Sequence, residues 1–338
     1  LVKTSSLGDV IHNLPAVSDL LRGDPRAVVD WCVEESFAAI PRLHPGVRNV
    51  IPVALRRWRK TPLNGAVWRE IRQLRAALRA ADYDFVIDTQ GLFKSAVLAR
   101  QARGVRCGYA AASAREPLAA LFYQRTFVVA KGQHAVARNR QLVAAAGGLP
   151  AGLPLDYGLC PAAPDFPWLP HTDYAVLLTA TSRDDKLWDE GHWIELAGKL
   201  RQCGLKALFP GGSGLERERA ERLAKAVPGA IAVPPLAIDA LARLLTGARV
   251  AVGVDTGLTH LAAALAVPTV AIYAETSPAL FAFPAAGYAL VLATASRNAA
   301  AGPPGTHEAT AAGWRRGVLT AATIATTLAL AGAVLAAQ

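Results

Sequence analysis

The sequence predicts an α/β protein of two domains, each built around a parallel sheet, and three observations support this fold class. Apolar runs typical of buried strands alternate with helical patterns through both halves of the chain. Six prolines fall within the 21 residues from 150 to 170, where no periodicity is sustained, which predicts a linker. The length of 338 residues suits two domains better than a single core. We therefore expect parallel sheets of right-handed βαβ units, with a central cleft between the domains for the chemistry.

Individual elements follow from the local patterns. Strands of the first half are expected at residues 28–33, 47–53, 85–87 and 126–130. Strands of the second half are expected at residues 174–178, 207–209, 230–233, 250–254 and 269–273. Helices are expected between them, among others at residues 67–81, 193–203 and 215–227.

The composition favours a folded protein with an anionic partner. Apolar residues make up 52% and charged residues 18%, which argues against disorder. The net charge of +10 favours nucleotides, nucleic acid or an anionic membrane surface. Four cysteines without a CxxC pair argue against zinc ligation and a disulfide framework, and fit a reducing cytoplasm. No signal peptide is visible, and the absence of methionine leads us to expect natural residues before Leu1.

The C-terminal stretch 318–337 is uncharged and follows Trp314, Arg315 and Arg316, as a membrane span could. Alanine and threonine dominate it, however, whereas a span usually carries more Leu, Ile and Phe. The composition favours a packed C-terminal helix with membrane-surface contact over a spanning helix.

The stretch around Asp255 predicts a buried strand, a tight turn and a helix. The apolar run 250–254 precedes Asp255, Thr256 and Gly257, and an apolar stretch resumes soon after them. Asp255 or Thr256 can cap the new helix, and Gly257 allows close approach of the backbone. N–H groups at a helix start favour phosphate, so we expect an anionic ligand here.

The opening of the chain has the same design, a short strand followed by a Ser/Gly turn and a helix. Ser6 lies in this turn, and Asp9 lies near the helix start, where a carboxylate is stabilised as an anion. Asp9 is either an N-terminal helix residue of structural value or a general base at the domain interface. His12, one turn further on, is an alternative base, although a lone helical histidine is more often structural.

Several cations of the first half could bind an anionic substrate. Arginine forks suit phosphate and carboxylate groups, although a charge run is usually a solvated face. The candidates are the run Arg56, Arg57, Arg59 and Lys60, and the single residues Lys94, Arg115 and His134.

In the second half, small hydroxyl residues follow a predicted strand. Thr181 and Ser182 could cradle phosphates, and Lys186 could neutralise one; the alternative is a loop with internally paired charges. Glu216 follows a glycine-rich strand-to-helix turn that matches neither a dinucleotide fingerprint nor a P-loop. If the sheet is parallel, these turns converge on its carboxyl edge, in an arrangement that suits a nucleoside diphosphate.

The chain closely resembles the inverting lipopolysaccharide heptosyltransferases that use ADP-heptose. Within that family it most resembles the heptosyltransferase I class. The stretches that carry the resemblance are 2–10, 33–35, 56–60, 90–95, 114–117, 133–136, 179–186 and 255–260. The runs 56–60 and 179–186 point to the class that adds the first heptose. The match thins after Pro278, and the tail from Gly317 is more apolar than is typical of the family.

The resemblance implies a GT-B fold of two facing Rossmann-like domains. Residues 1–155 would bind the acceptor, residues 170–310 would bind ADP-heptose, and residues 311–338 would form a helix that packs back on the N-terminal domain. The reaction it implies is transfer of L-glycero-D-manno-heptose to the first Kdo of Kdo2-lipid A, with inversion and without a bound metal or other cofactor. It also implies a cytoplasmic enzyme, peripheral on the inner membrane, that does not bind nucleic acid.

The resemblance assigns roles residue by residue. Asp9 matches the catalytic base, and Lys186 would support the departing diphosphate. The donor site would comprise Thr181, Ser182, Lys186, Glu216, Asp255, Thr256, Gly257 and His260. The acceptor site would comprise Ser6, Arg56, Arg57, Arg59, Lys60, Lys94, Arg115 and His134.

Three alternative functions stay open. Heptosyltransferase II uses the same donor with a heptosylated acceptor. A nucleotide-sugar epimerase has a similar two-domain shape and needs no acceptor. A non-catalytic anion-binding or membrane-binding protein would not depend on Asp9.

Overall fold

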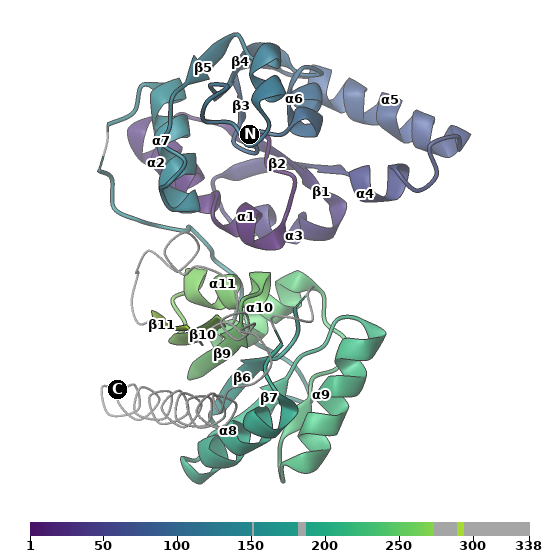
Figure 1. Ribbon diagram of the computed structural model, residues 1–338, viewed down its shortest axis with the longest axis vertical. Helices are drawn as coiled ribbons and strands as arrows, with labels where there is room; N and C mark the ends of the chain where they lie inside the picture. The colour runs from purple at the N-terminus through teal and green to yellow at the C-terminus, as the bar shows by residue number, and fades with distance from the viewer. Residues whose placement is uncertain (151, 182–186, 274–288, 294–338) are drawn as a thin grey trace, which may run out of the picture. The chain divides into compact units, whose positions relative to one another are not determined.

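The computed structural model describes residues 1–150, 152–181, 187–273 and 289–293 (Figure 1). The chain divides into two compact units, Leu1–Cys160 and Pro161–Gln338. The division between Cys160 and Pro161 falls inside the proline-rich stretch 150–170. The expected C-terminal helix over 311–338 lies outside the described residues.

The first unit contains two parallel sheets joined by the N-terminus. β1 (Val29–Glu34) pairs with β2 (Val47–Val53), and β4 (Arg103–Tyr109) lies between β3 (Asp82–Asp88) and β5 (Arg125–Phe127). Val2 forms parallel bridges to Cys32 of β1 and to Asp88 of β3, so residues 1–4 act as a central strand. The order is therefore β2, β1, residues 1–4, β3, β4, β5, which is that of a Rossmann sheet.

Helices cover both faces of these strands (Figure 1). On one face, α5 and α6 pack with Val86 of β3; on the other, α2 and α7 pack with Ile87. Successive residues of a strand face opposite sides, which explains why Val86 and Ile87 belong to different core clusters. The helices are α1 (Leu7–Ile11), α2 (Leu14–Gly23), α3 (Ala39–Arg42), α4 (Leu55–Trp58), α5 (Gly65–Arg79), α6 (Phe93–Ala99) and α7 (Ala135–Gly147), with the 3₁₀ turns η1 (Glu35–Phe37) and η2 (Pro117–Phe122).

The second unit repeats this strand order in a single parallel sheet, β8, β7, β6, β9, β10, β11. Its strands are β6 (Tyr174–Leu178), β7 (Lys206–Phe209), β8 (Ile231–Ala232), β9 (Val250–Val254), β10 (Thr269–Tyr273) and β11 (Ala289–Ala293). Its helices are α8 (Glu190–Gln202), α9 (Gly214–Ala226), α10 (Ile238–Thr246) and α11 (Gly257–Ala264). The strand order reverses between β6 and β9, and ligands of open α/β sheets bind at such a switch point.

All nine predicted strands are confirmed, with small shifts at their ends. The strand expected at 126–130 ends at Phe127, because the Val129 N–H donates to Ser113 Oγ at 2.9 Å and not to a neighbouring strand. β4 was not predicted, since two arginines and two glycines interrupt its apolar pattern. Among the described residues, no helix has the length and apolar character needed to cross a bilayer; the stretch 318–337 lies outside them.

Candidate functional site

Asp9 lies at the start of α1, directly after the central strand segment 1–4. Its Oδ2 accepts hydrogen bonds from the Ser6 N–H at 3.0 Å and from Ser6 Oγ at 3.2 Å. Arg115 Nη1 lies 3.8 Å from the same oxygen, and the Asp9 side chain is 22% exposed. Within the described residues these contacts all involve Oδ2. The arrangement therefore presents Oδ1 of a partly exposed carboxylate as a proton acceptor beside an arginine.

Two buried side chains hold the loop that carries Asp9. Gln90 Oε1 accepts from the Thr4 N–H at 3.0 Å and from the Ser5 N–H at 3.2 Å. Lys3 Nζ donates to the Thr89 carbonyl oxygen at 3.0 Å. Burial lowers the pKa of Lys3, and the Asp9 and Asp88 carboxylates oppose that shift. Neither Gln90 nor Lys3 was predicted as a site residue.

Asp88 fixes the turn from which Gln90 projects. The side chain is fully buried, and Oδ1 accepts from the N–H groups of Gln90 at 2.8 Å and Gly91 at 3.3 Å. The Tyr123 hydroxyl donates to Oδ2 at 2.7 Å. Burial raises the pKa of Asp88, although these hydrogen bonds act in the opposite direction. The turn after β3 is thus a rigid support for the loop around residues 4–9.

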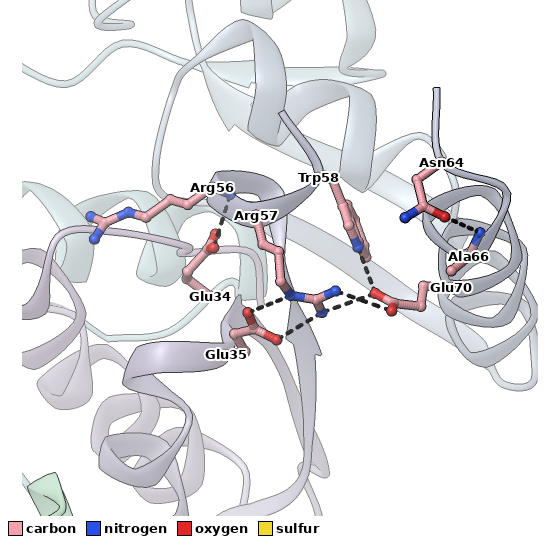
Figure 2. Close-up of polar contacts among 8 residues, drawn as sticks. All are labelled: Glu34, Glu35, Arg56, Arg57, Trp58, Asn64, Ala66 and Glu70. Atoms are coloured by element: carbon pink, nitrogen blue, oxygen red, sulfur yellow. Dashed lines mark hydrogen bonds and ion pairs between the residues drawn. The ribbon is translucent and has the colours of Figure 1, made fainter. Parts of the chain in front are cut away.

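The basic run 56–60 begins on α4 and is held by three glutamates (Figure 2). Glu34 Oε1 accepts from the Arg56 backbone N–H at 3.0 Å. The Arg57 guanidinium bridges Glu35, at 3.2 and 3.1 Å, and Glu70, at 3.1 and 2.9 Å. Arg57 is therefore committed to two carboxylates of its own unit, and these hydrogen bonds raise its pKa.

The other residues of this run divide into anchors and exposed cations. Trp58 packs in the core beside α5, and its Nε1 donates to Glu70 Oε2 at 2.7 Å (Figure 2). The Arg56 guanidinium lies 5.0 Å from the centre of the Phe37 ring. Arg59 and Lys60 are exposed, and neither side chain has a hydrogen bond or ion pair within the described ranges. They are the cations of the run that an anion can reach without breaking a pair.

The remaining predicted acceptor residues occupy different environments. Arg115 lies beside Asp9 with its side chain 63% exposed, and Lys94 is exposed on the first turn of α6. His134 is the N-cap of α7, where its Nδ1 accepts from the Val136 N–H at 3.1 Å. Its ring packs edge-on against His12, with ring centres 5.3 Å apart. Capping gives His134 a structural function, and its acceptor role stays a prediction.

In the second unit, the turns after β6 and β9 meet at the switch point. Thr181 Oγ1 donates to the Asp255 carbonyl oxygen at 3.3 Å. His260 Nε2 lies 3.7 Å from Asp255 Oδ1, and both side chains are largely buried, at 7% and 10% exposed. Thr256 occupies the N-cap position of α11, and the backbone of Gly257 starts the helix. The structure therefore brings Thr181, Asp255 and His260 together, with the start of α11 beside them.

A glycine lets the first turn of α11 pack directly against the end of β9. Thr259 Oγ1 donates to the Val254 carbonyl oxygen at 2.7 Å, and a Cβ at Gly253 would collide with this hydroxyl group. The absent side chain at Gly253 thus allows α11 to start immediately at the strand end, where its N–H groups face the turn.

Glu216 serves as a helix cap. Its Oε2 accepts from the N–H groups of Gly212 and Ser213, both at 2.9 Å, and Ser213 Oγ accepts from the Glu216 N–H at 3.3 Å. This reciprocal capping box starts α9. A ribose contact from Glu216 stays a prediction, as do the roles of Ser182 and Lys186, which lie outside the described residues. The part of the chain that the structure describes contains no group of three or more His, Cys, Asp or Glu side chains placed to hold a metal ion.

Comparisons with known proteins identify the family. The model of glycosyltransferase family 9 (heptosyltransferase) matches residues 71–301. The chain is 47% identical over 284 residues to lipopolysaccharide heptosyltransferase 1 of Escherichia coli K12, which covers 83% of this chain and 88% of that protein. It is 48% identical over 288 residues to the protein of that name from Pseudomonas aeruginosa, covering 82% of this chain and 79% of the relative.

Solved structures agree with the sequence comparisons. E. coli heptosyltransferase WaaC with ADP superposes with a TM-score of 0.80 at 44% identity, covering 87% of this chain and 92% of that one. The same enzyme with ADP-2-deoxy-2-fluoro heptose gives 0.77 at 44% identity, covering 86% and 91%. These matches confirm the predicted fold class, the GT-B fold of Rossmann-like domains, and the prediction of a glycosyltransferase. The chain belongs to glycosyltransferase family 9, the heptosyltransferases.

Proposed function

We propose that this enzyme transfers L-glycero-D-manno-heptose from ADP-heptose to the first Kdo of Kdo2-lipid A, with inversion at the anomeric carbon. The similarity to relatives named lipopolysaccharide heptosyltransferase 1 supports the choice of pathway and class. The observation that carries the mechanism is the Asp9 carboxylate, held at the switch point of the first sheet with one oxygen turned to Ser6 and Arg115. Such a carboxylate suits a general base.

The donor side of the proposal rests on the second unit. WaaC was solved with ADP and with a fluorinated ADP-heptose, and this chain is 44% identical to it. The diphosphate would lie at the start of α11, against the N–H groups of Thr256 and Gly257 and the hydroxyl group of Thr181. Ser182 and Lys186 would complete the phosphate contacts. Asp255, beside His260, would accept hydrogen bonds from heptose hydroxyl groups.

The proposed transfer is a single displacement. The Kdo hydroxyl oxygen attacks the anomeric carbon and gives its proton to Asp9. As the new C–O bond forms, the bond from the anomeric carbon to the phosphate oxygen breaks, and its electron pair leaves with ADP. Thr181, Lys186 and the backbone N–H groups at the start of α11 stabilise the charge that grows on the diphosphate. Attack from the face opposite the leaving group inverts the anomeric centre.

The acceptor side uses the cations of the first unit. Arg59, Lys60, Lys94 and Arg115 are exposed and match the carboxylates of Kdo and the phosphates of lipid A. We also propose that the reaction needs no metal ion, and that the enzyme works in the cytoplasm on the inner face of the membrane, where its acceptor is anchored. Under this proposal, addition of EDTA leaves the rate of transfer unchanged.

One assay separates this function from its rivals. ADP release is measured with ADP-heptose and either Kdo2-lipid A or its heptosylated product as acceptor. Rapid release with Kdo2-lipid A alone supports the proposal. A preference for the heptosylated acceptor would indicate heptosyltransferase II, and conversion of ADP-heptose without any acceptor would indicate an epimerase.

A further inference from the structure

Exposed apolar side chains gather on η2 and on the start of α6. Leu118 is 63%, Leu121 80% and Phe93 47% exposed. A 3₁₀ turn has three residues per turn, so Leu118 and Leu121 lie one above the other on the same face of η2. The neighbouring face carries the buried Ala119 and the half-buried Phe122, which pack against α6. One face of η2 therefore packs against α6, and the face that carries Leu118 and Leu121 is exposed to solvent.

Phe93 adds a third exposed apolar side chain, on the first turn of α6 beside η2. Its backbone N–H donates to Glu116 Oε2 at 2.6 Å, immediately before η2. Its ring packs edge-on against Phe122, with ring centres 5.3 Å apart. Three exposed apolar side chains therefore come from two elements that are fixed to each other by a hydrogen bond and an aromatic contact, which makes the surface rigid.

Three cations lie on or next to the two elements that carry these apolar side chains. Lys94 follows Phe93 on α6, the Arg100 guanidinium lies 6.0 Å from the centre of the Phe122 ring, and Arg115 precedes η2. Glu116 lies among them with its carboxylate bonded to the Phe93 N–H. Exposed apolar side chains together with basic side chains on the same two elements match the interface of an anionic bilayer, where the acyl boundary accepts the former and the headgroups attract the latter.

The position of this surface relative to Asp9 favours a bilayer over other partners. Arg115 belongs both to these three cations and to the Asp9 site, with Nη1 3.8 Å from Oδ2. An acceptor whose acyl chains stay in a membrane has to meet Asp9 close to the membrane surface. This step rests on the proposed function.

We propose that Phe93, Leu118 and Leu121, together with Lys94, Arg100 and Arg115, form the surface by which the first unit docks on an anionic phospholipid bilayer. The leucines enter the interface, and the cations hold the anionic headgroups. The contact places Asp9 near the membrane-bound sugar.

The test is co-sedimentation of the full chain with vesicles of phosphatidylethanolamine and phosphatidylglycerol. Leu118→Gln/Leu121→Gln should weaken binding by roughly 10-fold or more, because two side chains that enter the interface become polar. Val28→Gln is the matched control, since Val28 is also apolar and 58% exposed but lies just before β1. Arg100→Gln should weaken binding a few-fold to these vesicles and have little effect with phosphatidylcholine vesicles, since one headgroup contact is lost.

Two outcomes would overturn the docking surface: absence of vesicle binding by the wild type, or binding by the double variant as tight as that of Val28→Gln. A second readout separates docking from catalysis. With a deacylated, water-soluble Kdo acceptor the double variant should match the wild type, and with acceptor in vesicles it should be slower. If the wild type transfers heptose to neither acceptor, the proposed function fails, whereas sedimentation still decides the docking surface.

Discussion

The two units carry the same strand order but hold their aspartates differently. In the first unit, Asp9 lies in the first turn of α1, the loop before that helix is held by Gln90 and Lys3, and the Asp9 side chain is 22% exposed beside Arg115. In the second unit, Asp255 directly follows β9, its side chain is only 10% exposed, and His260 lies beside it. A proton acceptor must meet the substrate oxygen, whereas a sugar-binding residue gains from being fixed and desolvated. The proposed difference in chemistry therefore matches a difference in exposure: the Asp9 carboxylate is more exposed than the Asp255 carboxylate, although both follow the ends of strands in sheets of the same order.

The largest expected effect is that of replacing Asp9, the proposed base. Asp9→Asn should keep the hydrogen bond from the Ser6 N–H but cannot take a proton, so kcat should fall by a factor on the order of 10² to 10⁴. The Kd of ADP-heptose, measured by calorimetry, should stay within about 2-fold of the wild type. Turnover close to that of the wild type would remove Asp9 from the mechanism.

Asp255 should show the opposite pattern. If Asp255 accepts hydrogen bonds from the sugar as proposed, Asp255→Asn weakens them, so the Kd of ADP-heptose should rise roughly 10- to 100-fold. The Kd of ADP, which lacks the heptose, should change much less. ADP is therefore the internal control, and an equal loss for both ligands would contradict the sugar-binding role.

The support beneath Asp9 is the next test. Gln90→Met leaves the Thr4 and Ser5 N–H groups without their buried acceptor, which costs about 1–3 kcal/mol of stability. Loss of loop geometry should also lower kcat by about 10-fold while the Kd of ADP-heptose is retained. Gln90→Glu keeps an acceptor oxygen and serves as the partial rescue. If Gln90→Met lowers thermal stability alone, Gln90 does not position the base.

The basic run offers a smaller effect and a direct contrast between neighbours. Replacing Arg56, Arg57 and Arg59 together should weaken acceptor use and spare ADP-heptose binding. Singly, Arg59→Ala should raise the KM of the acceptor several-fold, about 1 kcal/mol, because an exposed cation that can meet phosphate is lost.

Arg57→Ala should affect the acceptor KM indirectly, by changing the conformation of residues 56–60, since Glu35 and Glu70 already bind this guanidinium. Its effect on the acceptor KM should therefore shrink once Glu70→Gln is present, whereas the effect of Arg59→Ala should not. Additive effects for the Arg57 and Glu70 variants would show that the two residues act independently.

The smallest expected effect concerns pH and Lys3. Burial lowers the pKa of Lys3 from 10.5. At a pH between the lowered pKa of the folded protein and the pKa of the unfolded chain, the unfolded chain holds a proton that the folded protein has lost. The free energy of unfolding contributed by this side chain therefore rises with pH across that window. As the pH rises towards 10.5, the wild type should gain stability relative to Lys3→Met in urea unfolding. The exposed Lys94→Met is the control for removing a lysine charge; an equal gain there would argue against burial as the cause.

The strands were predictable because parallel sheets bury short runs of Val, Ile and Leu, as in β9. β4 was missed because Arg103, Arg106 and two glycines interrupt its apolar pattern, so that only residues 107–109 are buried. Asp9, Thr181 and Asp255 could be predicted as site candidates because each lies in a turn or helix start that follows a predicted strand.

The supporting residues could not be found in this way. Lys3 and Gln90 act on partners 86 residues away, and no local pattern encodes such a pairing. The charges of the run 56–60 are visible in the sequence. The sequence does not show that the Arg57 guanidinium is already bound by Glu35, 22 residues before it, and by Glu70, 13 residues after it. Local sequence therefore indicates which residues can react, and tertiary contacts decide which of them remain available.

Tyr123, whose hydroxyl group donates to the buried Asp88, should be coupled to Gly108 in sequence variation. The Tyr123 ring lies so close to the backbone of Gly108 that a Cβ there would collide with it. A homologue with alanine at position 108 should therefore have lost the tyrosine as well, and a deep mutational scan should reveal the two positions as dependent. Since Tyr123 directly follows η2, a substitution at Gly108, on the middle strand β4 of its sheet, should also shift the exposed leucines of η2. The absence of a Cβ at position 108 thereby restricts which residue pairs are compatible with this part of the fold.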